Sequence, residues 1–462
     1  MTQPPMQTTS PLTQEWQQRS LAAVWHPCTQ MARAAVLPPL AITRGAGPWL
    51  FDFDGKRYFD ANSSWWVNLF GHADAGINAA IKQQLDTLPH VMLAGCTHAP
   101  AVRLAERLSA LTGGALGHVF YGSDGASAVE IALKQSFHSW RNRGRAEKRE
   151  FVCLKNGYHG ETIGALAVTD VKVFRDAYDP LLMRAHIVES PDARLGNEAQ
   201  ALAALRDLLT ERAGQIAAVI IEPLVQGAAG MVMYGSEYLR GLRALCTEFN
   251  VHLIVDEIAM GCGRTGTFFA WEHAGPLRPD QWPDFITLSK GITGGTMPLS
   301  LVLTTEAVYQ AFWSEDVARG FLHSHSYTGN ALACAAANAV LDRFDAGQLQ
   351  ANALQAELLR AAFAPLAAHP NVKHLRQQGM ILAFDVQAAG LRFAERFHLA
   401  ARAHELLIRP IGTTVYLMPP YVIDADTAAF LAQAVTLTLD EVLSQSPESH
   451  SPAHGPDQPH VA

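Results

Sequence analysis

The sequence lacks several features that mark particular classes of protein. Its 35 Lys and Arg residues form no basic runs and the formal net charge is -8, so nucleic acid is not an expected partner. No apolar run is long enough to span a bilayer, and the N-terminus lacks the apolar stretch of a signal peptide. We therefore expect a cytoplasmic protein that has small molecules, and neither membrane nor nucleic acid, as its ligands.

The six cysteines are never spaced as a metal site or redox pair requires. None approaches a Cys-x-x-Cys spacing, so we expect reduced thiols and no zinc site. His323 and His325 form a close histidine pair, but no carboxylate or cysteine stands at ligand spacing beside them. The sequence therefore predicts no metal site.

The length and composition predict a large core and more than one domain. A chain of 462 residues that is 49% hydrophobic is longer than one compact core usually needs. The ends, 1–14 and 444–462, are poor in apolar residues, and we expect them to be disordered. Between them we expect a large domain over 76–338 and a smaller α+β domain that combines 15–75 with 339–443.

Short apolar strands alternate with amphipathic helices through the middle of the chain. Residues 118–121 predict a strand that is followed by a helix over 126–140, and 216–221 predict another strand. Such alternation predicts an α/β fold with a mostly parallel sheet covered by helices. The flanks differ, because Asp54-Gly55 is a turn signal between two short hairpin strands.

Two predicted strands are followed by residues whose side chains can take part in catalysis. The strand over 251–255 leads into Asp256, and the strand over 285–288 leads into Ser289 and Lys290. Because open parallel sheets place ligands at the carboxyl ends of their strands, this carboxylate and this amine share one edge. Each also has a structural explanation: Lys290 can pair with a carboxylate, and Asp256 can cap a helix or pair with Arg264.

Three glycine-containing segments bear on ligand binding. Residues 121–126 follow a strand and open a helix, whose free amides and dipole would hold a phosphate, although an ordinary helix cap needs no ligand. Tyr158 stands between glycines, so its ring could approach a flat cofactor closely. Residues 261–266 have the spacing of a dinucleotide fingerprint, which would indicate a nicotinamide oxidoreductase, but no clear helix start follows, so we interpret the match as accidental.

Together these residues resemble the class III family of pyridoxal-phosphate-dependent aminotransferases. The family signature is an acidic pair, a glycine-rich stretch and a distant lysine, which here run from Asp256-Glu257 through Gly266 to Lys290. The resemblance covers about 25–441 and implies the fold-type I architecture. It also implies pyridoxal 5'-phosphate as the cofactor and a homodimer whose subunits share their active sites.

The resemblance also implies a role for individual residues. Lys290 would form a Schiff base with the cofactor and act as the catalytic base, Asp256 would keep the pyridine nitrogen protonated, and Tyr158 would lie near the ring. Further implied cofactor contacts come from Gly125, Ala126, His325 and Ser326, the last from a partner subunit, and implied substrate contacts come from Cys28, Trp65, Tyr158, Lys290, Ser324, Arg409 and Tyr416.

The most specific part of the resemblance is the double tryptophan Trp65-Trp66 together with residues 416–421. It indicates family members that transfer the amino group of S-adenosylmethionine to 8-amino-7-oxononanoate by a ping-pong reaction, giving 7,8-diaminononanoate for biotin. We expect Arg409 to bind the carboxylate of the acceptor. Trp65 would line its alkyl chain and attract the sulfonium of the donor, whereas core packing also explains Trp66.

The sequence departs from the family pattern at three places. Cys28 stands where a substrate-contacting tyrosine is usual, which removes a hydrogen-bonding group. Ser324-His325-Ser326 replaces a Gly-Pro-Thr segment, and Ala126 replaces a hydroxyl residue, yet Ser326 keeps a hydroxyl for the phosphate. Two alternatives therefore stay open: another class III ω-aminotransferase, with lysine or another amine as donor or pyruvate as acceptor, and a non-catalytic cofactor-binding protein.

Overall fold

The computed structural model describes residues 10–444, so the disorder predicted for 1–9 and 445–462 lies outside the described residues. The prediction was wrong for residues 11–14, which form the first turn of helix α1 (Pro11–Ala23), and for Ser444, which ends helix α14 (Ala425–Ser444). The Ser10 hydroxyl accepts a hydrogen bond from the Thr13 amide at 3.3 Å, and the Thr13 hydroxyl donates to Asp54 at 2.8 Å. Capping and a first-turn proline stabilise this helix although it has few apolar residues.

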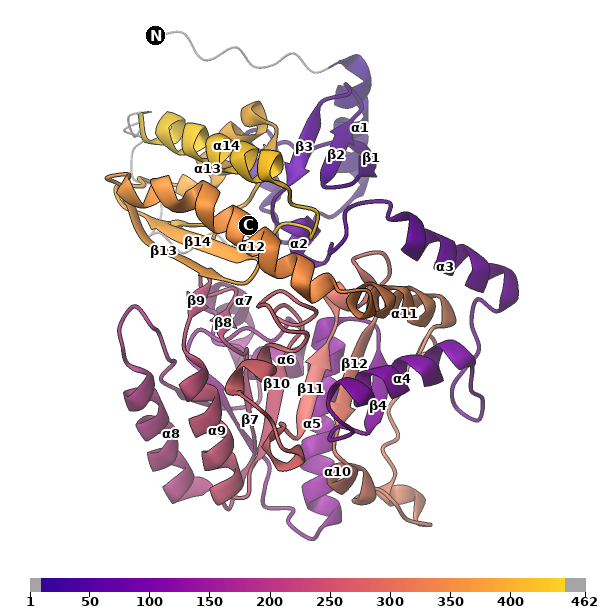
Figure 1. Ribbon diagram of the computed structural model, residues 1–462. Helices are drawn as coiled ribbons and strands as arrows, with labels where there is room; N and C mark the ends of the chain where they lie inside the picture. Colours follow the sequence, from indigo (N-terminus) through magenta and orange to yellow (C-terminus); the bar gives the residue numbers. More distant parts are fainter. Residues whose placement is uncertain (1–9, 445–462) are drawn as a thin grey trace.

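A seven-stranded sheet forms the centre of the larger part of the molecule (Figure 1). Its order is β4-β12-β11-β10-β7-β5-β6, and only β12 pairs antiparallel with its neighbours. The predicted α/β fold with a mostly parallel sheet is therefore confirmed. The strands are β4 (His118–Gly122), β5 (Glu150–Leu154), β6 (His186–Val188), β7 (Ile216–Ile221), β10 (His252–Asp256), β11 (Phe285–Leu288) and β12 (Ser300–Thr304).

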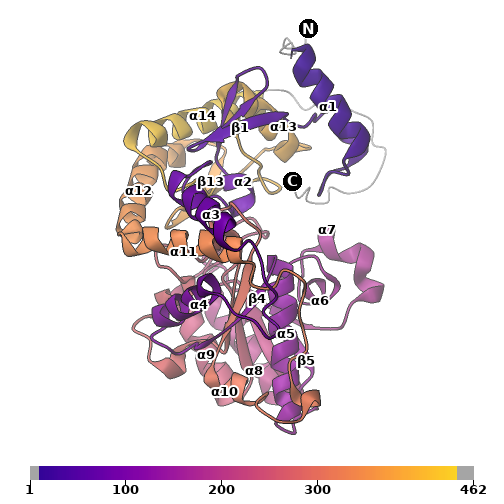
Figure 2. The same ribbon diagram turned by 90° about the vertical axis from the view of Figure 1, so that its right-hand side faces the viewer.

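Helices cover both faces of this sheet (Figures 1 and 2). Alternate strand residues enter two separate clusters: Val219 packs with the helices α8 and α9, whereas Ile220 packs with α5. This alternation is the reason that the central strand β7 is apolar at every residue. The helices of the larger part are α4 (Ala99–Leu111), α5 (Gly125–Asn142), α6 (Ile163–Ala167), α7 (Lys172–Arg175), α8 (Glu198–Arg212), α9 (Ser236–Glu248) and α10 (Glu306–Gln310).

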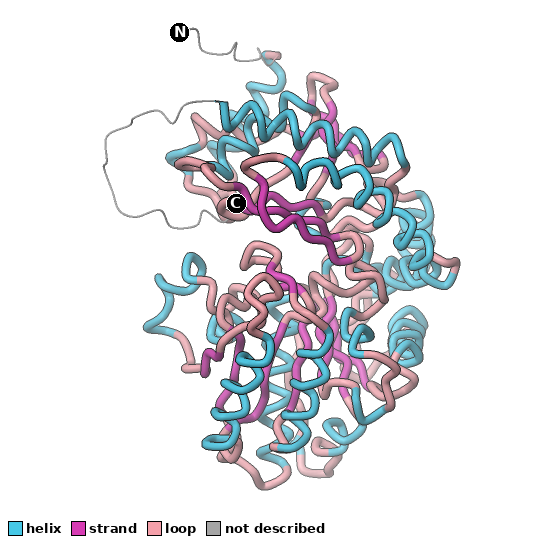
Figure 3. Tube along the Cα trace, turned by 60° about the vertical axis from the view of Figure 1, so that its left-hand side comes forward, coloured by secondary structure: helices cyan, strands magenta, loops and turns pink. Residues whose placement is uncertain are grey.

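The smaller part combines segments from both ends of the chain. In its four-stranded sheet, β3 (Arg57–Asp60) runs parallel to β15 (Leu406–Leu407), so residues far apart in the sequence become neighbours. A three-stranded sheet lies between the helices of this part and the larger part (Figure 3). The remaining strands are β1 (Ile42–Ala46), β2 (Trp49–Asp52), β13 (Val372–Gln378), β14 (Ile381–Val386), β16 (Thr414–Leu417) and, in a separate hairpin, β8 (Val225–Gln226) and β9 (Val232–Met233).

Long helices connect and cover the two parts. The domain boundary predicted between 338 and 339 falls inside α11, which continues to Asp345, because the next helix-breaking residue is Gly347. Within the described chain, no helix combines the length and apolarity needed to cross a membrane. The remaining helices are α2 (Ser63–Trp66), α3 (Ala75–Thr87), α11 (Ala331–Asp345), α12 (Gln348–Phe363), α13 (Phe393–Ala401) and α14 (Ala425–Ser444).

Candidate active site

The predicted amine and carboxylate meet at one edge of the seven-stranded sheet. Asp256 ends β10 and is in register with Thr287 of β11, and Lys290 begins a short 3-10 turn after β11. Burial lowers the pKa of Lys290 to about 8, and the nearby carboxylates of Asp256 and Glu222 oppose this shift. The Nζ of Lys290 lies 4.4 Å from the ring centroid of Trp66.

Both carboxylate oxygens of the buried Asp256 are held in place. Its Oδ2 lies 2.8 Å from Nδ1 of His159, and its Oδ1 accepts from the Ile258 amide at 3.1 Å and the Thr287 hydroxyl at 3.2 Å. Asp256 does not pair with Arg264, whose guanidinium donates to backbone carbonyls of the smaller part. The ion pair with Arg264 that the sequence left open for Asp256 is therefore absent, and only turns follow β10, so Asp256 has no helix to cap.

The glycine-rich segment 261–266 forms turns and no α-helix follows it. The next element is a 3-10 turn over Ala270–Ala274, which Glu257 caps: its two carboxylate oxygens accept from the amides of Ala270 and Trp271, each at 2.8 Å. Because a dinucleotide fingerprint needs a helix terminus after its glycines, the match to that fingerprint is accidental, as predicted.

Two buried residues of the site were missed from the sequence. His159 is 2% exposed, and its Nε2 has no hydrogen-bond partner among residues 10–444. Glu222 accepts from the amides of Tyr158 at 3.0 Å and Gly227 at 2.9 Å, and burial raises its pKa to about 7. Glu222 directly follows β7, so the rule on carboxyl ends of strands could have found it. His159 gave no signal beyond following Tyr158.

The predicted phosphate loop and the tyrosine loop pack against each other. Gly160 has a φ of +121°, and a Cβ there would lie only 2.6 Å from the Cβ of Ala126. Asp124 caps α5 by accepting from the Ser127 amide at 2.9 Å, which leaves the first amides of the helix at its open end. Helix N-termini of this kind bind phosphate.

Around this open end lie two further side chains. The hydroxyl of Tyr158 donates to Glu161 at 2.9 Å, so the phenol is held at one side of the loop. Ile258, which was not predicted from the sequence either, packs against Gly125: a Cβ on the glycine would lie 3.1 Å from two carbons of Ile258. An apolar residue two positions after an acid carries no polar signal, so only the structure reveals it.

The double tryptophan combines packing with a place at the site. Trp66 is 5% exposed, and its indole nitrogen donates to the Tyr416 hydroxyl at 3.0 Å. Trp65 is 41% exposed. Both belong to α2, where Ser64 and Trp65 have left-handed helical angles, a conformation that costs about 1–2 kcal/mol per residue. The packing explanation for Trp66 therefore holds, and the same ring also lies over the amine of Lys290.

Arg409 has the properties of a binding group for an anion. Within the described residues it forms no ion pair, its Nε is buried without a partner, and burial lowers its pKa. Its backbone amide donates to the side-chain oxygen of Asn62 at 2.7 Å.

Cys28 is exposed and lies near two charged residues of the site. Partial desolvation, and to a smaller extent the charge of Glu161, raises the pKa of its thiol, whereas the charge of Arg409 lowers it. The N-terminal segment thus reaches the region of Arg409 and Glu161.

The Ser324-His325-Ser326 segment lies beside the phosphate loop of its own chain. The Nε2 of His325 is 3.1 Å from the hydroxyl of Ser123, and the carbonyl of Ser326 lies 2.7 Å from Nε2 of His90. Ser324 and Ser326 are exposed. The predicted contact of Ser326 with the phosphate of a partner subunit stays a prediction.

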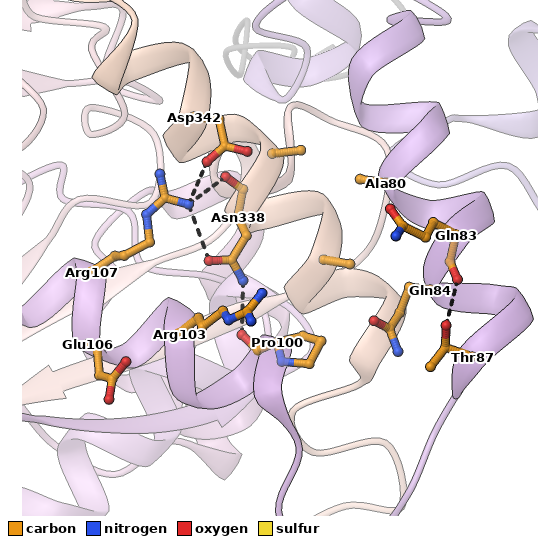
Figure 4. Close-up of a pocket in the computed structure, with 12 residues that line it drawn as sticks. Ala80, Gln83, Gln84, Thr87, Pro100, Arg103, Glu106, Arg107, Asn338 and Asp342 are labelled. Carbon is orange, nitrogen blue, oxygen red and sulfur yellow. Dashed lines mark hydrogen bonds and ion pairs between the residues drawn. The ribbon is translucent and has the colours of Figure 1, made fainter.

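A separate cavity of about 510 Å³ lies between α3, α4 and α11 (Figure 4). Its Arg107 forms an ion pair with Asp342 at 2.9 Å and donates to the carbonyl of Asn338, also at 2.9 Å. None of the predicted site residues lines it, and its most buried cation is neutralised internally. The site described above is therefore distinct from this cavity.

The residues of the site fit a flat, phosphorylated carbonyl cofactor. Lys290 supplies an amine whose lowered pKa favours a covalent bond to a carbonyl. Asp256 supplies a buried carboxylate for a protonated ring nitrogen, and the open end of α5 supplies amides for a phosphate. No group of three metal-ligating side chains is present within residues 10–444.

Comparisons with known proteins agree on one family. The sequence pattern described as aminotransferase class-III matches residues 30–439. The adenosylmethionine-8-amino-7-oxononanoate aminotransferase of Helicobacter pylori is 42% identical over 92% of this chain and 99% of that protein. The crystal structure of the enzyme of that name from Methanocaldococcus jannaschii has a TM-score of 0.87 and 32% identity, covering 93% of this chain and 99% of that one. A PLP-bound amine transaminase from an uncultivated Pseudomonas species has a TM-score of 0.84 and 30% identity, covering 91% and 99%.

Proposed function

The chain belongs to the class III aminotransferase family, and from this premise we propose that it transfers the amino group of S-adenosylmethionine to 8-amino-7-oxononanoate. The product is 7,8-diaminononanoate, an intermediate of biotin synthesis. As in the rest of the family, the cofactor is pyridoxal 5'-phosphate. The observation that carries the proposal is the convergence of Lys290, Asp256 and the open end of α5 at one edge of the sheet. The names of the relatives support the choice of substrates.

Lys290 is the proton carrier of the reaction. Pyridoxal phosphate, when bound, supplies a ring that accepts the electron pair left on a substrate carbon when its proton departs. With a pKa of about 8, a substantial fraction of Lys290 is neutral near pH 7 to 8, so its Nζ can take that proton and return it. The ring of Trp66, 4.4 Å away, restricts where this amine can move.

Asp256, positioned by His159, would hold the cofactor's ring nitrogen in its protonated form. A carboxylate at this position stabilises the positive charge on the nitrogen, and the contacts from His159, Ile258 and Thr287 fix its orientation. The amides of Gly125 and Ala126 would hold the phosphate. Residues from three segments therefore orient one flat molecule.

Substrate binding would use Arg409 for the carboxylate of the acceptor. The guanidinium has no ion-pair partner among the described residues, and a carboxylate can accept from it in a bidentate manner. The exposed ring of Trp65 would contact the alkyl chain. The hydroxyl of Tyr158 donates to Glu161, and an acidic group beside this tyrosine suits a cationic donor such as a sulfonium or an ammonium ion.

A second candidate is a class III enzyme with another amine donor, such as lysine. Cys28 favours this candidate, because it stands in the region of Arg409 and Glu161 in place of the larger tyrosine and leaves space for a different ligand. The candidates share the cofactor and the roles of Lys290 and Asp256. They differ only in the donor, so a comparison of donors separates them.

The experiment is an end-point assay by mass spectrometry. The purified enzyme with added cofactor is incubated with 8-amino-7-oxononanoate and either S-adenosylmethionine or lysine. We expect 7,8-diaminononanoate with the first donor and none from the variant Lys290→Ala. Product formed with lysine alone would select the second candidate, and no product with any donor would contradict both.

We further propose that the enzyme is a cytoplasmic homodimer with shared sites, in which Ser326 reaches the phosphate bound by a partner subunit. The exposed position of Ser326, with the exposed Leu322 and Tyr327 beside it, supports this assignment. Six unpaired cysteines support a reducing compartment.

The dimer is tested by its mass and by mixing variants. The subunit mass is 50.1 kDa, so sedimentation should give twice this value. Mixing Lys290→Ala with Ser326→Ala subunits should restore one intact site per hybrid dimer, whereas independent sites would give no complementation.

A further inference from the structure

The segment Ser63–Trp66 has a backbone conformation that its residues do not favour. The φ angles are +51°, +48°, +72° and +74°, and all four residues carry a Cβ. The turn closes with hydrogen bonds from the Trp66 amide to the Asn62 carbonyl at 2.8 Å and from the Val67 amide to the Ser63 carbonyl at 2.9 Å. One left-handed helical turn of L residues is strained, so the surrounding structure must hold it.

Asp60 stabilises the turn Ser63–Trp66 through hydrogen bonds from Ser64. It is 1% exposed at the end of β3, and its Oδ1 accepts from the Ser64 amide at 2.8 Å. Its Oδ2 accepts from the Ser64 hydroxyl at 2.6 Å and lies 2.9 Å from Nε2 of His72. The carboxylate thus binds both the backbone and the side chain of the second residue of the turn. A buried acid with charge-assisted hydrogen bonds of this kind is a strong local constraint.

The turn lies beside three residues of the proposed substrate site, Trp65, Arg409 and Tyr416, and beside Trp66, which covers Lys290. It presents Trp65 to solvent and buries Trp66 over the amine of Lys290. Immediately before the turn, the side chain of Asn62 accepts from the amide of Arg409 at 2.7 Å and donates to the carbonyl of Tyr416 at 3.0 Å. The backbone of this one segment therefore links both tryptophans to the arginine and the tyrosine.

We propose that Asp60 is a positioning residue for substrate binding: it holds Ser63–Trp66 in the left-handed turn and so sets the places of Trp65 and Trp66 relative to Arg409. This inference deepens the proposed function and rests on it for the identity of the substrates. Asp60 itself contacts neither the proposed substrate nor the cofactor groups.

The first test measures the turn without any reaction. The protein is labelled with 5-fluorotryptophan, and the ¹⁹F resonances of Trp65 and Trp66 among the nine tryptophans are assigned with Trp65→Phe and Trp66→Phe. In Asp60→Asn, which loses the charge and one acceptor, we expect these two resonances to shift and broaden. The matched control is Asp52→Asn, because Asp52 is also buried in the four-stranded sheet and accepts from two amides and a tyrosine hydroxyl.

The second test is a steady-state comparison. In Asp60→Asn we expect KM for 8-amino-7-oxononanoate to rise about tenfold or more, because Trp65 and Arg409 act on binding. We expect kcat to fall by a smaller factor, because Trp66 lies over the amine of Lys290. Adding Ser64→Gly to this variant should lower KM again, since glycine adopts positive φ without a Cβ penalty. A residue that only stabilises the fold would change the yield of active enzyme and leave KM unchanged.

Several results would overturn the proposal. Unchanged Trp65 and Trp66 resonances in Asp60→Asn would show that the carboxylate does not hold the turn, and altered resonances with an unchanged KM would show that the turn does not affect binding. If Asp60→Asn fails to fold, Ser64→Ala removes the hydroxyl contact alone and must give the same changes in smaller size. If the wild-type enzyme does not act on these substrates, the proposed function fails, and the ¹⁹F comparison still tests the turn.

Discussion

Adjacent acidic residues take different roles in this site. Asp256 faces His159 and the cofactor region, whereas Glu257 turns back into the protein and caps a 3-10 turn. The sequence shows only that both acids follow a predicted strand, whereas the structure shows that their side chains have different roles. The chemistry of the site thus depends on single side chains whose charge is set by burial and by one or two neighbours.

The pH dependence of cofactor attachment should follow the amine of Lys290. Its pKa is lowered from 10.5 to about 8, so the amine is protonated below that pH and nucleophilic above it. In the apoprotein, the rate of attachment, followed by stopped-flow absorbance, should rise with pH and level off above about 8. Glu222→Gln should move the midpoint to lower pH, because the carboxylate of Glu222 raises this pKa. The exposed Glu211→Gln is the control, and a midpoint near 10 would contradict the assignment.

Substitution of Arg409 should affect binding more than catalysis. Arg409→Lys keeps the charge but loses the planar fork, so we expect KM for the amino-keto acid to rise about tenfold or more with kcat little changed. KM for S-adenosylmethionine should change less. Arg396→Lys is the control, because the hydrogen bonds of Arg396 go to the backbone carbonyls of Ala389, Leu391 and Val442. Equal effects of the two variants would refute the role of Arg409.

At the scale of secondary structure, most elements follow from local sequence and the strained ones do not. The strand β7 and most of α5 were predicted within a residue or two, because apolar periodicity determines them. The turn Ser63–Trp66 could not be predicted, since neither serine nor tryptophan favours positive φ and the stabilising Asp60 lies outside any local motif. Helix α1 was missed because its stability comes from capping and from Asp54 of a distant hairpin.

The cap supplied by Glu257 should contribute measurably to stability. Both of its oxygens accept amide hydrogens, so Glu257→Gln places a donor against a donor in a buried position. We expect a loss of about 1–3 kcal/mol in the free energy of unfolding by urea. The exposed Glu248→Gln should cost about 1 kcal/mol or less, although it also breaks an ion pair. A neutral effect of Glu257→Gln would mean that the cap is not needed.

At the scale of the whole molecule, the site lies where the two parts of the chain meet. Lys290 and Asp256 come from the larger part, whereas Trp66, Arg409 and Tyr416 come from the smaller part. Both sets of residues could be predicted only from the family resemblance, because no periodicity in the sequence indicates that β3 and β15 pair. Side-chain contacts between residues separated by hundreds of positions are not encoded locally.

Arg264 connects the larger part of the molecule, to which it belongs, to the smaller part by hydrogen bonds. It is 1% exposed and donates to the carbonyls of Asn68 at 2.9 Å and Pro419 at 2.6 Å, with its guanidinium 4.9 Å from the ring centroid of Tyr421. Arg264→Met leaves these carbonyls without donors, so we expect a loss of about 3 kcal/mol or more in the free energy of unfolding. Arg264→Lys should lose less because it keeps some donors. A change below 1 kcal/mol in both, on the scale of about 1 kcal/mol for a net hydrogen bond, would contradict this role.

The proposed function depends most on the first half of the reaction. Purified enzyme saturated with pyridoxal phosphate is mixed with S-adenosylmethionine alone, without any keto acid, and the visible absorbance band of the lysine-bound cofactor is followed. We predict that the band disappears as the aminated cofactor forms, and that it is absent from Lys290→Ala from the start. A band that persists with S-adenosylmethionine but disappears with another amine would contradict the proposed donor. A protein that never develops the band would contradict the assignment of Lys290.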